Sequence, residues 1–221
     1  MDFSSSALLI IDLQNDFCPG GALAVSGGDE VVEPLNNLAR VFNLMGGKVI
    51  ATQDWHPQVH VSFSSSHPGK KRGDIIELEL PQGNINDQVL WPDHCVQGSS
   101  GADFHKNLDT AVFHLIVRKG YRKELDSYSA FFENDRITPT GLYGFLKGLS
   151  INSIFIGWLA TDYCVFYSAM DAVKLRLDSY VLLDAVRGVG YPEGSIEKAL
   201  KTLENAGANL VDSSFVKGGL K

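Results

Sequence analysis

The 221-residue sequence has few cysteines, no excess of basic residues and no long apolar run. Its three cysteines, Cys18, Cys95 and Cys164, lack zinc-finger spacing, and an odd number favours free thiols in a reducing compartment. No stretch approaches the roughly 20 apolar residues that span a bilayer, since Asp12 interrupts the early run at 7–11. The start also lacks the basic region of a secretory signal. These absences predict a cytoplasmic protein without a membrane partner.

Basic residues are outnumbered, with 19 Lys and Arg against 26 Asp and Glu, so the formal net charge is -7. A surface of this sign repels phosphate backbones on average, and we therefore expect no nucleic acid partner. Hydrophobic residues make up 44% of the chain and charged residues 20%, which is typical of a compact domain with a sizeable core. We expect a single domain over 1–221, and the sequence leaves a homo-oligomer open.

Short apolar runs rich in branched residues recur along the chain and predict buried strands. They lie at 7–11, 48–51, 112–117, 151–156, 179–183 and 208–211. Segments with helical spacing of apolar residues lie between several of them, at 32–45, 162–176 and 192–207. This alternation predicts a three-layer α/β fold, in which helices cover both faces of a mainly parallel sheet. The stretch 62–88 breaks the pattern, so we expect an inserted loop or flap there, with a short hairpin around 75–80.

Polar residues directly follow four of the predicted strands. They are Asp12, the pair Asp54 and His56, Lys119, and Cys164 after a short turn. In parallel sheets, ligands bind beyond the carboxyl ends of the strands, which all meet at one edge. We therefore expect these side chains to converge on one site.

Cys164 lies where a strand is followed by a helix, and Thr161 or Asp162 could cap that helix. Unpaired amides of the first helical turn and a neighbouring lysine should lower the thiol pKa from its usual value of about 8.5. A lone cysteine is more often a buried apolar residue, and a carboxylate beside an ammonium is more often a structural ion pair. Together, however, Asp12, Lys119 and Cys164 supply a base, a cation and a nucleophile.

A second group of polar residues has the chemistry of a metal site. Asp54 and His56 are two residues apart, so they face the same way on an extended segment, and His94 can complete the set from a later loop. Two histidines and one carboxylate leave coordination positions open, as a catalytic site requires, and they suit zinc, iron or manganese. An Asp-x-His pair is weak evidence alone. His60 is a further candidate, either as an extra ligand of the metal ion or as a contact of one of its ligands.

Five segments together resemble the nicotinamidases within the isochorismatase-like cysteine hydrolases. They are IDLQNDF at 11–17, DWHP at 54–57, WPDHCVQG at 91–98, KG at 119–120 and GWLATDYCV at 157–165. The resemblance implies the isochorismatase-like hydrolase fold. It also implies that the catalytic triad is Asp12, Lys119 and Cys164, and that the metal site is Asp54, His56 and His94, with one divalent ion, zinc before iron or manganese.

The same resemblance implies further site features. The Leu159–Ala160 peptide is expected to be cis, and the amides of Ala160 and Cys164 are expected to form the oxyanion hole. Phe17 and Trp91 resemble the walls that stack on the substrate ring, and Tyr128 is expected in the same pocket; ordinary core packing is the alternative for each of the three.

The resemblance implies hydrolysis of nicotinamide to nicotinic acid and ammonia through a cysteine thioester, a step of NAD salvage. One alternative is a related cysteine hydrolase that acts on another carboxamide, a carbamoyl compound or an isochorismate-like ether, which the metal ligands disfavour. Another is a metal-bound α/β module without catalysis, although such a module has no physical reason to keep a charged pair beside a thiol. A non-haem iron oxygenase shares the set of two histidines and one carboxylate. It is disfavoured because alternating strands and helices do not suit the all-β barrel associated with that chemistry.

Overall fold

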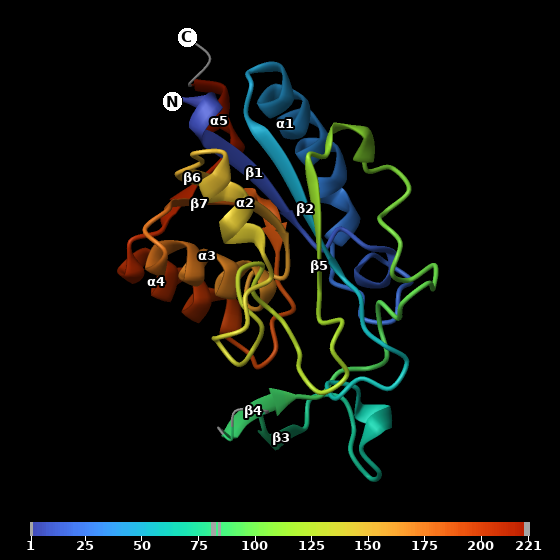
Figure 1. Cartoon of the computed structure of the whole chain (residues 1–221). Helices are drawn as coiled ribbons and strands as arrows, with labels where there is room; N and C mark the ends of the chain where they lie inside the picture. Colours follow the sequence, from blue (N-terminus) through green and yellow to red (C-terminus); the bar gives the residue numbers. More distant parts are fainter. Residues whose placement is uncertain (1, 81–82, 84, 219–221) are drawn as a thin grey trace.

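The computed structural model describes residues 2–80, 83 and 85–218, and its central element is a six-stranded sheet (Figure 1). The strands lie in the order β5-β2-β1-β6-β7-β8 and every neighbouring pair is parallel. Their bounds are β1 Ser6–Ile11, β2 Lys48–Asp54, β5 Leu115–Lys119, β6 Ser153–Leu159, β7 Asp178–Arg187 and β8 Asn209–Val211. The expected parallel sheet is confirmed.

Helices cover both faces of this sheet (Figure 1). They are α1 Val32–Leu44 and α5 Ser213–Gly218 on one face, and α2 Leu142–Gly148, α3 Cys164–Lys174 and α4 Ser195–Ala206 on the other. Alternate side chains of β1 show why both layers are needed. Leu8 and Ile10 belong to the apolar cluster that contains α1, whereas Leu9 and Ile11 belong to the cluster that contains α3. A strand that is apolar on both sides is stable only when both sides are covered, so the three-layer fold follows.

The helix α1 has the apolar spacing that predicted it, and it ends one residue before the expected bound, next to Gly46 with a φ of +84°. Strand β5 begins at Leu115 rather than Val112, because Thr110–Val112 form a 3-10 turn, in which the side chain of Asp109 accepts a hydrogen bond from the amide of Ala111. The short helices α2 and α5 were not predicted. Further 3-10 helices lie at Phe3–Ser5, Asn15–Phe17, Gly28–Val31 and Ser64–Ser66.

The expected hairpin is present as the antiparallel pair β3 Ile75–Glu79 and β4 Ile85–Val89. It does not join the main sheet but lies beyond the carboxyl ends of its strands (Figure 1). Positions 81, 82 and 84 of the predicted flap at 62–88 lie outside the described residues. The three cysteines are free and buried, as expected. Among the helices of the described residues, none is long and apolar enough to cross a membrane.

Candidate active site

The predicted triad residues lie at one edge of the sheet. Asp12 directly follows β1, Lys119 is the last residue of β5, and Cys164 is the first residue of α3, which follows β6 after a short turn. Because β5, β2, β1 and β6 are consecutive in the sheet, their carboxyl ends meet there. The topology thus brings together three groups that are far apart along the chain.

Lys119 is the centre of this group. Its Nζ lies 2.8 Å from Oδ2 of Asp12 and 3.5 Å from Sγ of Cys164. It also lies 2.5 Å from Oδ1 of Asp54, and it donates to the carbonyl of Ser127 at 3.0 Å. The lysine is fully buried, so the two carboxylates must stabilise its charge, and they raise its pKa well above the ordinary value even though burial lowers it. The ammonium therefore remains charged.

Asp12 has the properties of a general base. Burial and the charge of Asp54 raise the pKa of this carboxyl, Lys119 opposes both effects, and the resulting pKa is about 6. The hydroxyl of Thr52 donates to Oδ1 of Asp12 at 2.6 Å. Oδ2 contacts the Lys119 ammonium, and no other donor reaches it among the described residues. An oxygen of Asp12 lies within 4.8 Å of the Cys164 sulfur, so the carboxylate can accept the thiol proton.

Cys164 lies in the first turn of α3, as predicted, but the expected lowering of its pKa was wrong. Burial raises the pKa of the thiol well above its ordinary value; Lys119 lowers it, whereas Asp12 and Asp54 raise it. Two carboxylates outnumber the single ammonium in a dry site, so a third negative charge is unfavourable there. The sulfur of the free protein is therefore a thiol that needs a base.

Ala160 and Cys164, whose amides are expected to form the oxyanion hole, lie on either side of a short turn. The Leu159–Ala160 peptide is cis, as the resemblance implied. Tyr163 occupies the N-cap position of α3 and provides no side-chain cap, which leaves the first-turn amide of Cys164 uncapped. Ala160 and Cys164 both line the same cavity. The oxyanion hole at these two amides stays a prediction.

Asp162, one of the two residues expected to cap α3, does not cap it. Its carboxylate accepts hydrogen bonds from the amides of Val189 and Gly190, both at 2.9 Å, and from the hydroxyl of Ser195 at 2.6 Å. These bonds attach the turn before α3 to the loop before α4. The helix start remains open because its neighbouring acidic side chain is used elsewhere.

Asp54, His56 and His94 form a buried group whose ligand atoms all lie within 4.8 Å of one another. Nδ1 of His56 lies 2.8 Å from the carbonyl of Gly120, and Nδ1 of His94 lies 2.8 Å from the carbonyl of Pro92. A carbonyl can only accept, so in the neutral form of each ring Nδ1 carries the proton and Nε2 keeps its lone pair. Two imidazole nitrogens and one carboxylate are a donor set that fits a divalent transition metal, and this group could bind one.

The surroundings favour the ligand forms of His94 and Asp54. Burial and the charge of His56 lower the pKa of His94 to about 4, so this ring is neutral. Against the effect of burial, the carboxylate of Asp54 raises the pKa of His56, and neutralisation of this carboxylate by a metal ion would remove that effect. Burial raises the pKa of Asp54, but Lys119 and His56 outweigh it and the net shift is downward, so the carboxylate is ionised. Gly120 has a φ of +62°, and a Cβ there would collide with the His56 ring, so glycine permits the close approach.

His60 lies next to this cluster rather than within it. Its ring stacks on that of His56 with centroids 4.3 Å apart, and its Nδ1 lies 2.7 Å from the hydroxyl of Ser62. His56, His60 and Asp126 form a second buried group with ligand atoms within 4.8 Å. The structure therefore places His60 as a neighbour of one metal-ligand candidate.

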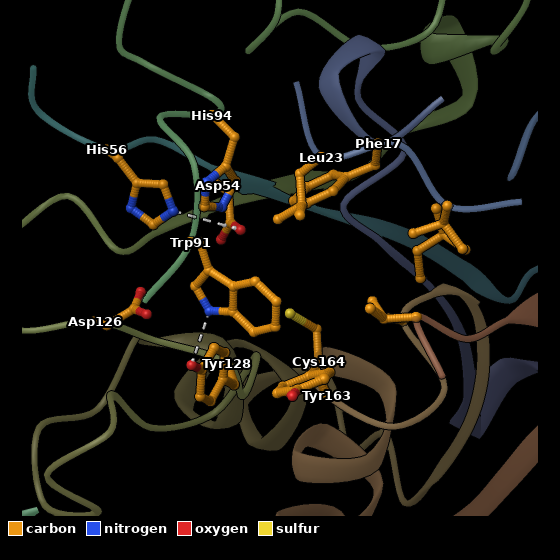
Figure 2. Close-up of a pocket in the computed structure, with 14 residues that line it drawn as sticks. Phe17, Leu23, Asp54, His56, Trp91, His94, Asp126, Tyr128, Tyr163 and Cys164 are labelled. Atoms are coloured by element: carbon orange, nitrogen blue, oxygen red, sulfur yellow. Dashed lines mark hydrogen bonds and ion pairs between the residues drawn. The ribbon is translucent and has the colours of Figure 1, made fainter. Parts of the chain in front are cut away.

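A cavity lies over Cys164. Phe17, Trp91 and Tyr128, which the sequence suggested as ring walls, all line it. The indole nitrogen of Trp91 donates a hydrogen bond to the Tyr128 hydroxyl at 3.1 Å. The ring of Phe17 packs edge-on against that of His94, with ring centroids 5.5 Å apart. Figure 2 shows the sulfur beside the Trp91 indole, with the histidines of the cluster at the same cavity. The Cys164 thiol and the candidate metal ligands thus face one space.

Comparison with known proteins agrees with this geometry. The family profile for the isochorismatase domain matches residues 6–214. The nicotinamidase of Acinetobacter baylyi is 44% identical over 210 residues, which cover 95% of this chain and 94% of that protein. The chain belongs to the nicotinamidases of the isochorismatase family.

Solved structures of the isochorismatase family extend the match. The structure of an Acinetobacter baumanii nicotinamidase pyrazinamidease has a TM-score of 0.89 and 43% identity, covering 96% of this chain and 98% of that one. The pyrazinamidase of Pyrococcus horikoshii, solved in complex with zinc, has a TM-score of 0.75 and 33% identity, covering 94% and 99%.

Several cavity residues of this isochorismatase-family chain were missed by the sequence reasoning. They are Leu23, Val25, Asp126, Leu159, Tyr163 and Val189. Leu23 and Val25 reach the cavity because their amides donate to the carbonyls of Asp16 and Phe17, at 2.9 and 3.0 Å. No sequence signal marks that fold-back. Tyr163 directly precedes the cysteine, and this adjacency could have identified it.

Proposed function

We propose that this chain hydrolyses nicotinamide to nicotinic acid and ammonia, with Cys164 as nucleophile, Asp12 as general base and acid, and Lys119 as the stabilising cation. The observation that supports this most is the shared cavity: the thiol of Cys164 and the Asp54–His56–His94 cluster face the same space, whose walls are aromatic. A flat pyridine ring fits between aromatic walls, and membership of the nicotinamidases supports the carboxamide.

The first step is proton transfer from the Cys164 thiol to the carboxylate of Asp12. The thiol pKa is raised, so a thiolate does not form without a base, and the pKa of about 6 lets Asp12 act as one at neutral pH. The Lys119 ammonium, 3.5 Å from the sulfur, offsets the negative charge that forms there. The thiolate then adds to the carboxamide carbon and produces a tetrahedral oxyanion.

The oxyanion would be stabilised by the amides of Ala160 and Cys164, and one such donor is worth about 3 to 4 kcal/mol in other hydrolases. Asp12 returns its proton to the amide nitrogen, the C–N bond breaks, ammonia leaves and a thioester remains. Asp12 next takes a proton from water, whose oxygen adds to the thioester carbon. The C–S bond then breaks, the proton returns to the sulfur, and nicotinic acid leaves.

We further propose that Asp54 and the Nε2 atoms of His56 and His94 hold one divalent ion, zinc before iron or manganese. When bound, such an ion coordinates nitrogen or water ligands and so orients a ring nitrogen. Its positive charge would also offset the carboxylate of Asp54, which lies within 4.8 Å of the cysteine sulfur. The residues of the chain then position the amide over the thiol.

Purified protein with nicotinamide tests this function, with ammonia and nicotinic acid measured together. We expect the two products in equal amounts, loss of turnover after chelation, and recovery when zinc, iron or manganese is returned. A carbamoyl compound is the matched comparison, and we expect much slower ammonia release from it. Turnover of the carbamoyl compound but not of nicotinamide would show that the chain is a relative with another substrate.

A further inference from the structure

The β3–β4 hairpin has one side chain that its exposed position does not explain. Ile75 and Ile85 are 60% and 69% exposed, as expected for a two-stranded ribbon outside the main sheet. Gln88, on the same hairpin, is only 1% exposed. A polar side chain is this deeply buried only when its hydrogen bonds are satisfied, so the contacts of Gln88 indicate what the hairpin does.

The Gln88 amide donates to the lining of the cavity. Its Nε2 lies 3.1 Å from Oδ2 of Asp126, 3.1 Å from the hydroxyl of Tyr128 and 2.8 Å from the carbonyl of Val89. Asp126 and Tyr128 line the cavity, whereas Gln88 does not reach its surface. The hairpin therefore contacts the cavity lining through the Gln88 amide, from the side that faces away from the cavity.

The hydroxyl of Tyr128 links the Gln88 amide to the indole of Trp91. It accepts hydrogen bonds from Nε2 of Gln88 and from Nε1 of Trp91, each at 3.1 Å (Figure 2 shows the second). Tyr163 packs edge-on against both rings, with centroids 4.9 Å from Trp91 and 5.5 Å from Tyr128. The position of the phenol thus affects the indole through a direct bond and through a shared neighbour.

The backbone around Trp91 is held independently of Gln88. The amide of Trp91 donates to Ser62 and its carbonyl accepts from Ser64, both at 2.8 Å, and Leu90 exchanges two further bonds of 2.8 Å with Gly73 and Asp74. Loss of the Gln88 amide should therefore leave the chain path unchanged. What it would release is the orientation of the two rings.

We propose that Gln88 is a positioning residue that fixes the Tyr128 phenol and the Trp91 indole as one wall of the substrate slot, so that the inserted hairpin acts as a brace of the site. The proposal rests on the proposed function, because the slot is the one expected to hold the pyridine ring. Gln88 touches neither the substrate nor the sulfur, so it contributes to binding and not to the chemical steps.

The test is Gln88→Met, which keeps the length of the side chain and removes its donor. We expect the KM for nicotinamide to rise about 5- to 10-fold, with kcat changed less than about twofold, because ring binding is weakened equally in the ground and transition states. The matched control is Asp87→Asn on the adjacent, exposed position, which should leave both constants unchanged. A merely structural role would lower the melting temperature or the active fraction without changing KM.

Tyr128→Phe provides a second arm, because it removes the shared hydroxyl acceptor and keeps the ring. If both variants act through that hydroxyl, the double variant raises KM by clearly less than the product of the single effects. Unchanged KM in Gln88→Met, or effects that multiply, would overturn the proposal. If Gln88→Met does not fold, Tyr128→Phe decides alone, since an unchanged KM there excludes the hydroxyl as the link.

A measurement without substrate separates this proposal from the proposed function. The emission of Trp91, obtained by subtracting the spectrum of Trp91→Phe, should shift in Gln88→Met and not in Asp87→Asn, because the indole N–H loses its fixed acceptor. Absence of nicotinamide turnover by the wild-type protein would refute the function and leave this test in place. An unshifted spectrum together with normal turnover would refute the brace alone.

Discussion

The charged group around Cys164 and the aromatic wall of the cavity are built in different ways. The charged group is called the floor and is defined as Cys164, which lines the cavity, together with Asp12 and Lys119 beside it. It comes from the ends of sheet strands and the first turn of a helix. The wall, defined as Phe17, Leu23, Trp91 and Tyr128, comes from turns and irregular segments between those elements. A parallel sheet holds its strand ends in fixed register, whereas a loop side chain depends on the contacts that its neighbours provide. The residues proposed for the chemical steps thus lie on the rigid strand and helix ends, whereas the shape of the substrate slot is set by the loop segments.

The two regions also differ in what stabilises them. The floor is a buried network of opposite charges, in which removal of one partner leaves another buried and uncompensated. The wall is held by ring packing and single hydrogen bonds of neutral groups. Changes in the floor should therefore affect the chemical step, and changes in the wall should affect binding and stability. The following predictions test that division.

The largest expected effect is that of Cys164→Ala. Ammonia release should fall by about 10⁴-fold or more, because no other nucleophile lies at the floor. Metal content and the urea midpoint should stay near the wild-type values, since the variant changes neither the metal ligands nor an ion pair. Elemental analysis and urea unfolding measure these properties. Cys18→Ala, at a buried thiol outside the cavity, is the control that should keep turnover. Full turnover by Cys164→Ala would remove the thioester route.

An intermediate effect is expected from pH. The base must be ionised, and burial raises the pKa of Asp12 to about 6, so kcat/KM should fall about tenfold per pH unit below that value and level off above it. Thr52→Val sharpens the assignment, because the Thr52 hydroxyl donates to Asp12 at 2.6 Å and lowers its pKa. The acidic limb should move to higher pH by about half a unit to one unit in this variant. An unmoved limb would mean that another group controls it.

The smallest effect on turnover is expected from Leu23→Ala in the wall. This side chain is 5% exposed and lines the cavity, so its truncation should lower the free energy of unfolding by about 2 kcal/mol, the low end for buried leucines because the space is already partly open. KM should rise a few-fold and kcat should change little. Leu44→Ala, at a position that is 83% exposed, should change none of these. A large loss of kcat in Leu23→Ala would show that wall and floor are coupled.

The strand-end residues could be predicted from the sequence because a parallel sheet leaves them little freedom. Once a residue ends a strand of the parallel sheet or directly follows one, as Lys119 and Asp12 do, its position at the carboxyl edge is determined. The wall was predicted only where a motif contained it. Leu23 and Gln88 lie in segments without periodicity, and their roles depend on a fold-back and on a hairpin that no local pattern places against the site.

The sequence by itself determined the main parallel strands, the alternation with longer helices that requires two helical layers, and the residues that meet at the sheet edge. These follow from side-chain periodicity and from parallel topology. The tertiary structure alone decided the protonation of Cys164 and the position of Gln88. A pKa depends on burial and on every charge around the group, and the side chains around Cys164 come from three other parts of the chain. The contact of Gln88 with Asp126 and Tyr128 likewise joins segments that are neighbours only after folding.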